Sequence, residues 1–279
     1  MLKNLFKNIR WLLNNSLDGV VNKNNYQDMY DITERTLYYV PNSNVYRPDN
    51  ILSPEETIDV IVNSNKSVAR FGDGEILIML KGSGVFQLYN EDLRRRLFEV
   101  LNYDGEDFLV CLPGLMFWRY LGMDDSFMFM NLPRFRNFLK NNLSQKKHYG
   151  ETNFYLDYGV FEKLRSVWDE KDIILVGCPE ALSKIQYDIY DNAKSIDYVF
   201  CRNRDCFSQY DWIVSEVKSA YKDGAIVILQ AGMTGTVLAY DFMKLGMRAL
   251  DLGHLQKAYD LYKKNLAVYE DPTFWDADV

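Results

Sequence analysis

One segment near the C-terminus constrains the fold more than any other part of the sequence. Residues 225–230 form an apolar run that predicts a buried strand, residues 232–235 predict a turn, and residues 236–245 predict a helix that ends at Gly246. A second strand is predicted at residues 248–252. A strand, a helix and a strand of these lengths suit a right-handed crossover between parallel strands. The sequence therefore predicts an α/β protein.

The preceding part of the chain alternates in the same way. Ser53 and Pro54, followed by two glutamates, predict the start of a helix that ends near Asn63. Further strands are predicted at 67–71, 107–112, 172–176 and 195–201, and further helices at 76–80, at 91–101 and from Pro179. This order favours one open, mostly parallel sheet with helices on both faces.

The first 24 residues differ from the rest of the chain. Their apolar side chains recur at helical spacing, and lysines and an arginine occupy the opposite face, so a basic amphipathic helix is expected. It either packs on the protein or a second subunit, which would make a homo-oligomer, or lies on the anionic inner face of a membrane. Residues 25–50 are expected to be a linker and residues 51–279 the main domain.

Charge and apolar patterning exclude several classes of protein. The 279 residues include 32 basic and 39 acidic side chains, for a net charge of −7, so no nucleic-acid partner is expected. No stretch approaches the roughly 18 apolar residues of a membrane span, and no signal peptide is recognisable. A cytoplasmic location is therefore expected.

Cysteine and histidine usage narrows the chemistry. The four cysteines contain no C-x-x-C pair, so free thiols are expected in place of a zinc site or a disulfide framework. The only two histidines are His148 and His254. No G-x-S-x-G, Walker A or G-x-G-x-x-G motif is present. Any function must therefore come from another arrangement of residues.

The ends of the predicted strands carry most of the chemically notable residues. Ligands bind at the carboxyl ends of strands in such sheets. Asp73 and Glu75, with Gly74 between them, are expected to face one hollow, where they would repel by roughly 3 kcal/mol at ~5 Å unless a cation intervened. Mg²⁺ or Mn²⁺ suits such oxygen ligands. The alternative is a solvated turn paired with Arg70.

Two other strand ends suggest further contacts. The N–H groups at Thr234 and Thr236, at the start of a helix, could hold a phosphate, or form only an ordinary helix start. Asp251 ends a presumed central strand, where an unpaired carboxylate is costly. His254 could pair with Asp251, meet a diphosphate, or be structural.

These residues, in this order, resemble the GT-D-type glycosyltransferases, a bacterial family first catalogued as a domain of unknown function. The similarity covers about residues 53–262. Its most specific parts are the R-F-G-D-G-E segment at 70–75 and the D-L-G-H segment at 251–254. Further matching segments are 149–152, 176–177, 232–236, 239–241 and 244–246.

The resemblance implies a Rossmann-like fold and transfer of a sugar, such as a hexose from UDP-glucose, to a glycan acceptor. It assigns a divalent metal to Asp73 and Glu75. It implies nucleotide-sugar contacts at the matching positions, which are Arg70, Phe71, Gly72, Thr152, Gly177, Gly232, Thr234 and Thr236. This chain has Met233 and Gly235 where the family has a proline and an alanine, which is expected to loosen that turn.

The sequence thus predicts metal-assisted glycosyl transfer in the assembly of a bacterial surface polysaccharide or glycoprotein. Glu75 and Asp251 are the candidates for the general base, and His254 is a third catalytic candidate. The acceptor could be a glycan, a lipid-linked glycan or a glycoprotein. The alternatives are a phosphoryl or nucleotidyl transferase and a non-catalytic partner in a glycosylation complex.

Overall fold

The computed structural model describes residues 50–114, 135, 138–156, 158–266, 268, 271 and 274. The chain divides into two compact units, and the one that carries the sheet consists of Asn50–Pro113 and Gln145–Val279. The other consists of Met1–Asp49 and Gly114–Ser144, and its helical residues 138–142 are described. The predicted amphipathic helix and, except for Asn50, the linker that follows it lie outside the described residues and stay predictions.

The described residues contain one sheet of seven strands in the order β3-β2-β1-β7-β6-β4-β5, and every neighbouring pair is parallel. This confirms the predicted parallel α/β architecture. The strands are β1 Ser67–Arg70, β2 Phe108–Leu112, β3 Gly150–Glu151, β4 Asp172–Gly177, β5 Ser195–Phe200, β6 Ile226–Gln230 and β7 Arg248–Asp251.

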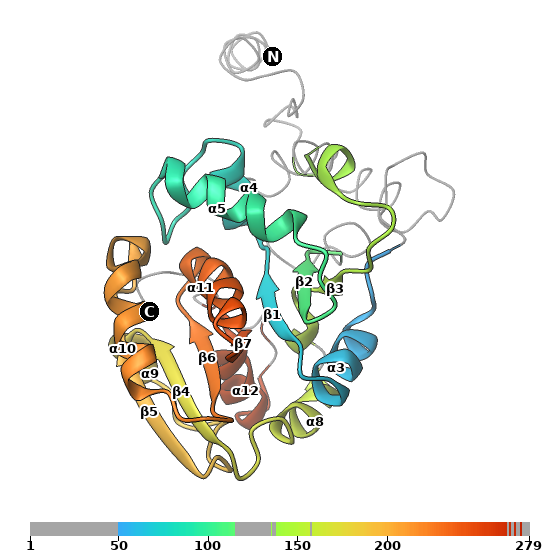
Figure 1. The fold of residues 1–279 in the computed structure, drawn as a ribbon. Helices are drawn as coiled ribbons and strands as arrows, with labels where there is room; N and C mark the ends of the chain where they lie inside the picture. The colour runs from blue at the N-terminus through green and yellow to red at the C-terminus, as the bar shows by residue number, and fades with distance from the viewer. Residues whose placement is uncertain are drawn as a thin grey trace, which may run out of the picture. The chain divides into compact units, whose positions relative to one another are not determined.

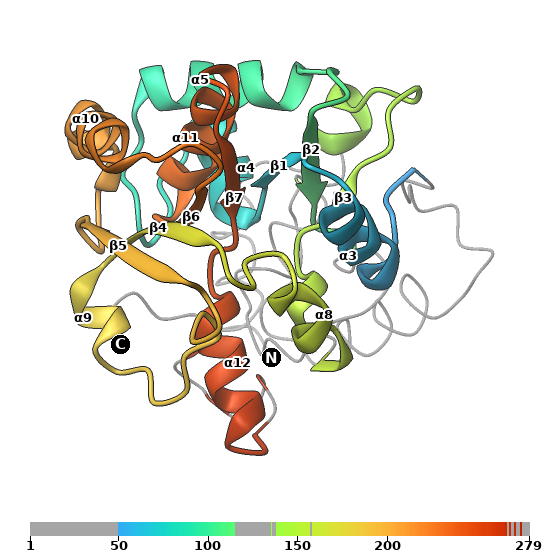
Figure 2. The ribbon, with the colours of Figure 1, turned by 60° about the horizontal axis from the view of Figure 1, so that its bottom comes forward.

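Helices cover both faces of the sheet, as predicted. Figures 1 and 2 show α5, α10 and α11 on one face and α3, α8 and α12 on the other. The described α-helices are α3 Pro54–Asn63, α4 Asp73–Met79, α5 Glu91–Asn102, α8 Phe161–Arg165, α9 Pro179–Leu182, α10 Tyr210–Ala220, α11 Met233–Lys244 and α12 Leu255–Lys263. In the described part of the chain, no helix is both long and apolar enough to cross a membrane.

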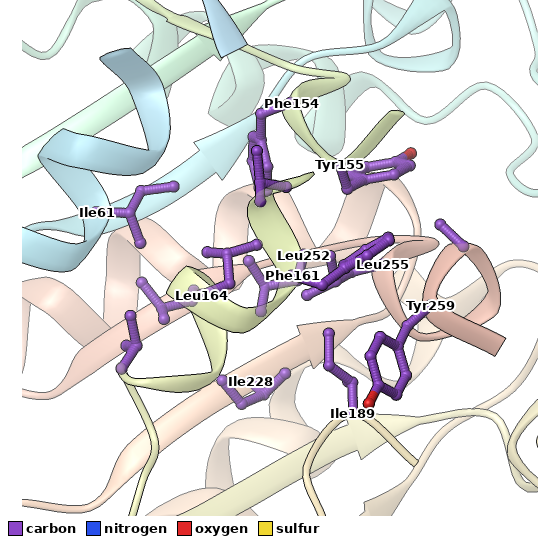
Figure 3. Packing of buried hydrophobic residues seen from close by; sticks show 14 of the residues in the cluster. Ile61, Phe154, Tyr155, Phe161, Leu164, Ile189, Ile228, Leu252, Leu255 and Tyr259 are labelled. Atoms are coloured by element: carbon purple, nitrogen blue, oxygen red, sulfur yellow. The ribbon is translucent and has the colours of Figure 1, made fainter. Parts of the chain in front are cut away.

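A large apolar cluster fixes the α3, α8 and α12 face. Alternate strand residues point into it, among them Val68 of β1, Ile228 of β6 and Leu250 of β7. Figure 3 shows Phe161 of α8 and Tyr259 of α12 within this cluster, and their rings lie edge to face with centroids 5.4 Å apart. On the opposite face, α11 packs on β1, β6 and β7, and α10 packs on β4 and β5. Burial on both faces accounts for the apolar runs in the sequence.

Two predicted turns are wrong, because each is the first turn of a helix. α4 begins at Asp73 and not at Ile76, since the Glu75 carboxylate accepts a hydrogen bond from the Gly72 N–H at 2.6 Å and caps the helix. α11 begins at Met233 and not at Thr236. Gly232 precedes it with a φ of 54°, a conformation that favours glycine.

The α3 start and the cysteines agree with the sequence. The Ser53 hydroxyl accepts from the Glu56 N–H at 3.2 Å, and the Glu56 carboxylate accepts from the Ser53 N–H at 2.8 Å. This is the predicted helix cap in its reciprocal form. All four cysteines are free and buried.

The topology changes direction between two adjacent central strands. The chain leaves β1 into α4, which packs on α5 beside α11, but it leaves β7 into α12 on the opposite face (Figure 2). Ligands of open α/β sheets bind where neighbouring strands send their connections to opposite faces. The carboxyl ends of β1 and β7 therefore mark the candidate site.

Candidate functional site

The two most specific sequence segments meet at the carboxyl ends of β1 and β7. The Arg70 N–H donates a hydrogen bond to Asp251 Oδ2 at 3.2 Å, and Arg70 Nη1 donates to the Leu252 carbonyl at 2.8 Å. These contacts follow the paired residues Val68 and Leu250, at the carboxyl ends of the two strands. The parallel register thus brings residues from opposite ends of the domain into one cluster.

The side chain of Thr236 contacts Arg70, Glu75 and Asp251. Its hydroxyl donates to the Arg70 carbonyl oxygen at 2.9 Å, and it lies 3.4 Å from Glu75 Oε1 and 3.3 Å from Asp251 Oδ2. The side chain is fully buried in the first turns of α11. Thr236 therefore positions the two acids and does not itself face a ligand.

Glu75 is a buried acid with an unusual proton affinity. Its side chain is 8% exposed, and one carboxylate oxygen is held by the Gly72 N–H. Burial, with the nearby negative charge of Asp251, raises the pKa of Glu75 to about 7, against the opposing effect of the Gly72 hydrogen bond. A carboxyl with this pKa exchanges its proton near neutral pH and suits general acid–base chemistry.

Asp251 is more buried and better compensated. Its side chain is 4% exposed at the end of β7. Burial raises the pKa of Asp251 to about 6, while the Arg70 charge, the Arg70 N–H and the Thr236 hydroxyl act in the opposite direction. Asp251 is therefore the weaker base of the two, and its contacts hold Arg70 in place.

Asp73 differs from Glu75 and Asp251 because its side chain is exposed to solvent. It is the first residue of α4 and is exposed, whereas Glu75 is buried. Residues two apart on an α-helix lie about 200° apart around its axis. The two carboxylates therefore do not face one hollow in the way the predicted turn would have arranged them.

The described residues include no group of three or more histidine, cysteine, aspartate or glutamate side chains that could hold a metal ion. Asp73, exposed in the first turn of α4, is nevertheless a hard oxygen ligand at the edge of the site. It fits a cation that takes its remaining ligands from a bound diphosphate and water, as Mg²⁺ commonly does.

Arg70 lies between a glycine and an aromatic ring. Its guanidinium carbon is 5.0 Å from the centre of the Tyr155 ring. A Cβ atom at Gly253, where φ is +48°, would lie 2.5 Å from Arg70 Nη1. Arg70 Nε and the Tyr155 hydroxyl are both buried without a hydrogen-bond partner. The site therefore holds a cation whose hydrogen-bonding capacity is not exhausted.

His254 has a mostly apolar environment. Its ring is half-buried, with centroids 6.0 Å from the ring of Phe86 and 5.6 Å from the ring of Phe274. Burial, with the charges of Arg70 and Lys257, lowers the pKa of His254 to about 3. The imidazole is therefore neutral at physiological pH. It can exchange hydrogen bonds with a ligand but adds no positive charge.

The start of α11 is more firmly packed than its glycines suggest. Met233 is buried, and its methyl group lies where Cβ atoms at Gly74 and Gly84 would be, within 2.2 and 2.4 Å. The Thr234 hydroxyl is buried without a hydrogen-bond partner. The loosened turn expected from Met233 and Gly235 is therefore wrong, because Met233 wedges this region against two neighbouring segments.

The remaining predicted contacts support the strand ends. The Thr152 hydroxyl donates to the Phe71 carbonyl at 2.7 Å, which ties the segment after β3 to the end of β1, and both side chains are buried. Gly177 pairs with Gln230 and Phe200 at the ends of β6 and β5. Thr152 and Phe71 are therefore buried residues that stabilise the carboxyl ends of the strands.

Two residues near the site were not predicted. Tyr155 lies under Arg70, and Phe86 lies beside His254. Tyr155 lies in a 3-10 helix of three residues, Phe154–Leu156, and Phe86 lies in a loop. Their neighbours at the site are far away in the sequence, so no local pattern indicates them. Only the abundance of aromatic residues suggested that some would face a ligand.

The fold is that of an α/β protein, and the strand-end cluster is its candidate ligand site, at a topological switch point. The sequence model of the family described as "Glycosyltransferase GT-D fold" matches residues 68–270. The chain belongs to this GT-D glycosyltransferase family. Both the resemblance drawn from the motifs and the expected fold are confirmed.

Individual relatives agree with this assignment. The chain is 29% identical to "Glycosyltransferase GlyD" of Streptococcus pneumoniae serotype 4 over 75% of its own length, and 29% identical to "Probable glycosyl transferase Gly" of Streptococcus gordonii over 78%. The alignments span only 27% and 33% of those two proteins.

Solved structures show the same fold. "A New Glycosyltransferase (DUF1792) from Streptococcus sanguinis" has a TM-score of 0.70 and 29% identity, and the match covers 78% of this chain and 86% of the other. A second structure, described by the words "The highly conserved domain of unknown function 1792 has a distinct glycosyltransferase fold", has a TM-score of 0.70 and 28% identity. That match covers 79% of this chain and 83% of the other.

Proposed function

We propose that this protein transfers a sugar, a hexose in the simplest case, from a nucleotide sugar such as UDP-glucose to a glycan acceptor. The observation that carries the proposal is the meeting of Glu75 and Asp251 at Thr236, on the ligand-binding edge of the sheet. Family membership supports the reaction class. Sugar transfer requires a group that accepts the proton of the acceptor hydroxyl, and this pair of acids supplies two candidates.

Donor binding is assigned to the Arg70 side and to the start of α11. Arg70 places a guanidinium charge at the carboxyl ends of β1 and β7, and a diphosphate is attracted to such a cation. The first N–H groups of α11, after Gly232, lie at the positive end of a helix dipole. Together they would stabilise the negative charge that develops on the leaving nucleoside diphosphate.

A divalent cation, Mn²⁺ or Mg²⁺, completes the proposal. Asp73 would hold it together with oxygens of the donor diphosphate and water, and when bound it would supply electrostatic stabilisation to the diphosphate. Glu75 would then stay free to accept a proton. The exposed position of Asp73 suits a ligand that arrives with the donor. Asp251 and Thr236 would keep the Glu75 side chain oriented from behind.

Glu75 is the better of the two candidates for the general base. An acceptor hydroxyl must lose its proton as the new glycosidic bond forms. Burial and the charge of Asp251 raise the pKa of Glu75, whereas the Arg70 charge and the Thr236 hydroxyl favour the ionised form of Asp251. Glu75 is therefore the acid whose environment favours uptake of that proton. His254, being neutral, is assigned a hydrogen-bonding role toward the donor.

A donor screen tests the proposal. The full chain would be mixed with a panel of UDP- and dTDP-sugars, with and without Mn²⁺, and assayed by thermal shift and by release of the nucleotide. Binding and release of UDP from a UDP-sugar support sugar transfer. Release of a nucleoside monophosphate would point to a nucleotidyl transferase instead. Absence of both binding and turnover across the panel would reject the proposal.

Location and acceptor form a second, separable part of the proposal. We infer a cytoplasmic protein whose residues 1–24 contact the anionic inner face of a membrane, where lipid-linked glycans or glycoproteins for the cell surface are built. Deleting residues 1–24 should abolish co-sedimentation with anionic vesicles. Unchanged sedimentation, or a dimer that dissociates on deletion, would favour protein packing of this segment.

A further inference from the structure

A loop between α4 and α5 lies over the ends of β6 and β7. Its Phe86 ring is half-buried, with its centroid 6.0 Å from that of His254. A Cβ atom at Gly232 would lie 3.9 Å from the Phe86 Cβ. Phe86 therefore borders the segment assigned to the donor diphosphate. The neighbouring Val85 is 67% exposed and Leu88 is 63% exposed, so the loop turns one aromatic ring inward and two aliphatic side chains outward.

A set of hydrogen bonds fixes this loop to the segment after β5. The Asp205 N–H donates to the Phe86 carbonyl at 2.8 Å, and Asp205 Oδ1 accepts from the Leu88 N–H at 2.8 Å and from Gln87 Nε2 at 3.2 Å. The buried Gln87 in turn accepts from the Phe207 N–H at 3.2 Å. Asp205 does this from a left-handed conformation, with a φ of 51°.

The left-handed conformation of Asp205 indicates that its contacts with the loop have a function. A non-glycine residue in the left-handed region persists only where its surroundings hold it, and such residues cluster at ligand-binding segments. Here the surroundings are the Phe86 carbonyl, the Gln87 side chain and the Leu88 N–H. The Met233 methyl also lies against Gly84 of the same loop and against Gly74 of α4. Met233 therefore connects the loop to α11 and to α4, the two helices that begin at the site.

We propose that Phe86 is a donor-binding residue, whose ring packs against the apolar face of a ring of the nucleotide sugar, and that Asp205 is the residue that positions it. The inference rests on the proposed function and identifies a further contact of the same site. The ring partner is either the base or the sugar. Both offer an apolar face that an aromatic side chain can cover, and covering it excludes water from the neighbouring polar groups.

The first experiment measures affinity for UDP and for UDP-glucose with the full chain in Mn²⁺, by titration calorimetry. Phe86→Ala should weaken binding about tenfold, and Phe86→Tyr, which keeps the ring, should restore it. Val85→Ala, in the same loop but facing solvent, is the matched control and should bind as the unchanged chain does. Weakening for both ligands assigns the base, and weakening for UDP-glucose alone assigns the sugar.

The outcomes separate this inference from the function on which it rests. If the unchanged chain binds neither ligand, the proposed donor and the inference both fail. If it binds and Phe86→Ala binds equally well, only the inference fails. Thermal unfolding of each variant shows whether the fold is intact, and an equal loss for Val85→Ala would mean that the loop matters only as a whole.

The second experiment tests positioning by Asp205. Asp205→Asn keeps the acceptor oxygen and tolerates the left-handed backbone, so it should retain most of the affinity, whereas Asp205→Ala should lose several-fold. In a double-mutant cycle, Asp205→Ala should cost nothing further once Phe86 is alanine. Full additivity of the two losses would overturn the positioning role, because Asp205 would then act on binding without Phe86.

Discussion

Glu75 of α4 and Asp251 of β7 share one hydroxyl partner, Thr236, at 3.4 and 3.3 Å. Burial raises the pKa of both acids, and the negative charge of Asp251 further disfavours ionisation of Glu75. The pair therefore stores unfavourable electrostatic energy at neutral pH, which is typical of residues selected for chemistry and not for stability. The contacts around this pair lead to four predictions.

Glu75→Gln should stabilise the fold at alkaline pH. The pKa of Glu75 is about 7 in the folded chain against a reference value of 4.5, so the folded state binds the proton more tightly. Below pH 4.5 both states are protonated and no penalty exists. As pH rises from 4.5 through 7 stability is lost, by on the order of 2–3 kcal/mol. Glutamine keeps the shape without the charge.

Urea unfolding in EDTA checks this. The variant should exceed the unchanged chain in unfolding free energy at pH 8 and match it at pH 4.5. Its sugar transfer should fall at least about 100-fold, as expected for loss of a general base. A variant that is less stable at both values of pH would show that the Glu75 charge is favourable in the fold, contrary to its environment.

Thr236→Val should destabilise the fold by about 1–3 kcal/mol. The change keeps the side-chain shape but leaves the buried Arg70 carbonyl without its donor and both acids without their shared partner. Thr236→Ser keeps the hydroxyl and is the control. Denaturant midpoints give the comparison, and equal midpoints for valine and serine would mean that the hydroxyl has no net effect.

Gly253→Ala should displace Arg70. The substitution adds strain at a φ of +48° and places a Cβ atom 2.5 Å from Arg70 Nη1. Gly246→Ala is a matched control, since its φ is +80° and no atom lies within 4 Å of the new Cβ. Both variants should lose about 1 kcal/mol of stability from backbone strain.

Donor affinity distinguishes the two glycines. Only Gly253→Ala should bind a nucleotide sugar more weakly, by about tenfold or more, because only it moves the guanidinium. Equal affinities for the two variants in a calorimetric titration would remove Arg70 from the list of donor contacts.

Asp73→Ala should abolish the response to Mn²⁺ without disturbing the fold. Asp73 is exposed at the first position of α4, so the change in unfolding free energy should stay below about 1 kcal/mol. Turnover measured against Mn²⁺ concentration gives the test, with Asp92→Ala, an exposed acid in the first turn of α5, as the control. A normal metal response would exclude Asp73 as a ligand.

The sequence predicted the parts of the fold that depend on local chemistry. The cap at Ser53 and the apolar strands β4 and β6 follow from side chains close together in the chain. The start of α4 was missed although a local signal existed. Glu75 stands three residues after Gly72, the spacing of a capping box, but glycine lacks the side chain that makes the pattern familiar.

Other features depend on contacts that no local pattern contains. β3 has two residues, too few for any periodicity, and exists because Cys111 and Leu112 of β2 pair with it. The environments of Glu75 and Asp251 arise from the β1–β7 register, so sequence alone left both open as the base. Phe86 owes its place to Asp205, far along the chain.

The packing of Met233 affects how the site could admit a ligand. Its thioether fills the gap between the Gly84 loop and the helix that carries Glu75. A methionine side chain is unbranched and adapts to irregular spaces. A Cβ atom at Gly74 or Gly84 would lie 2.2 or 2.4 Å from the Met233 methyl group, so any larger residue at either glycine would have to displace it. The two glycines therefore set how closely the loop beside the site can approach α4.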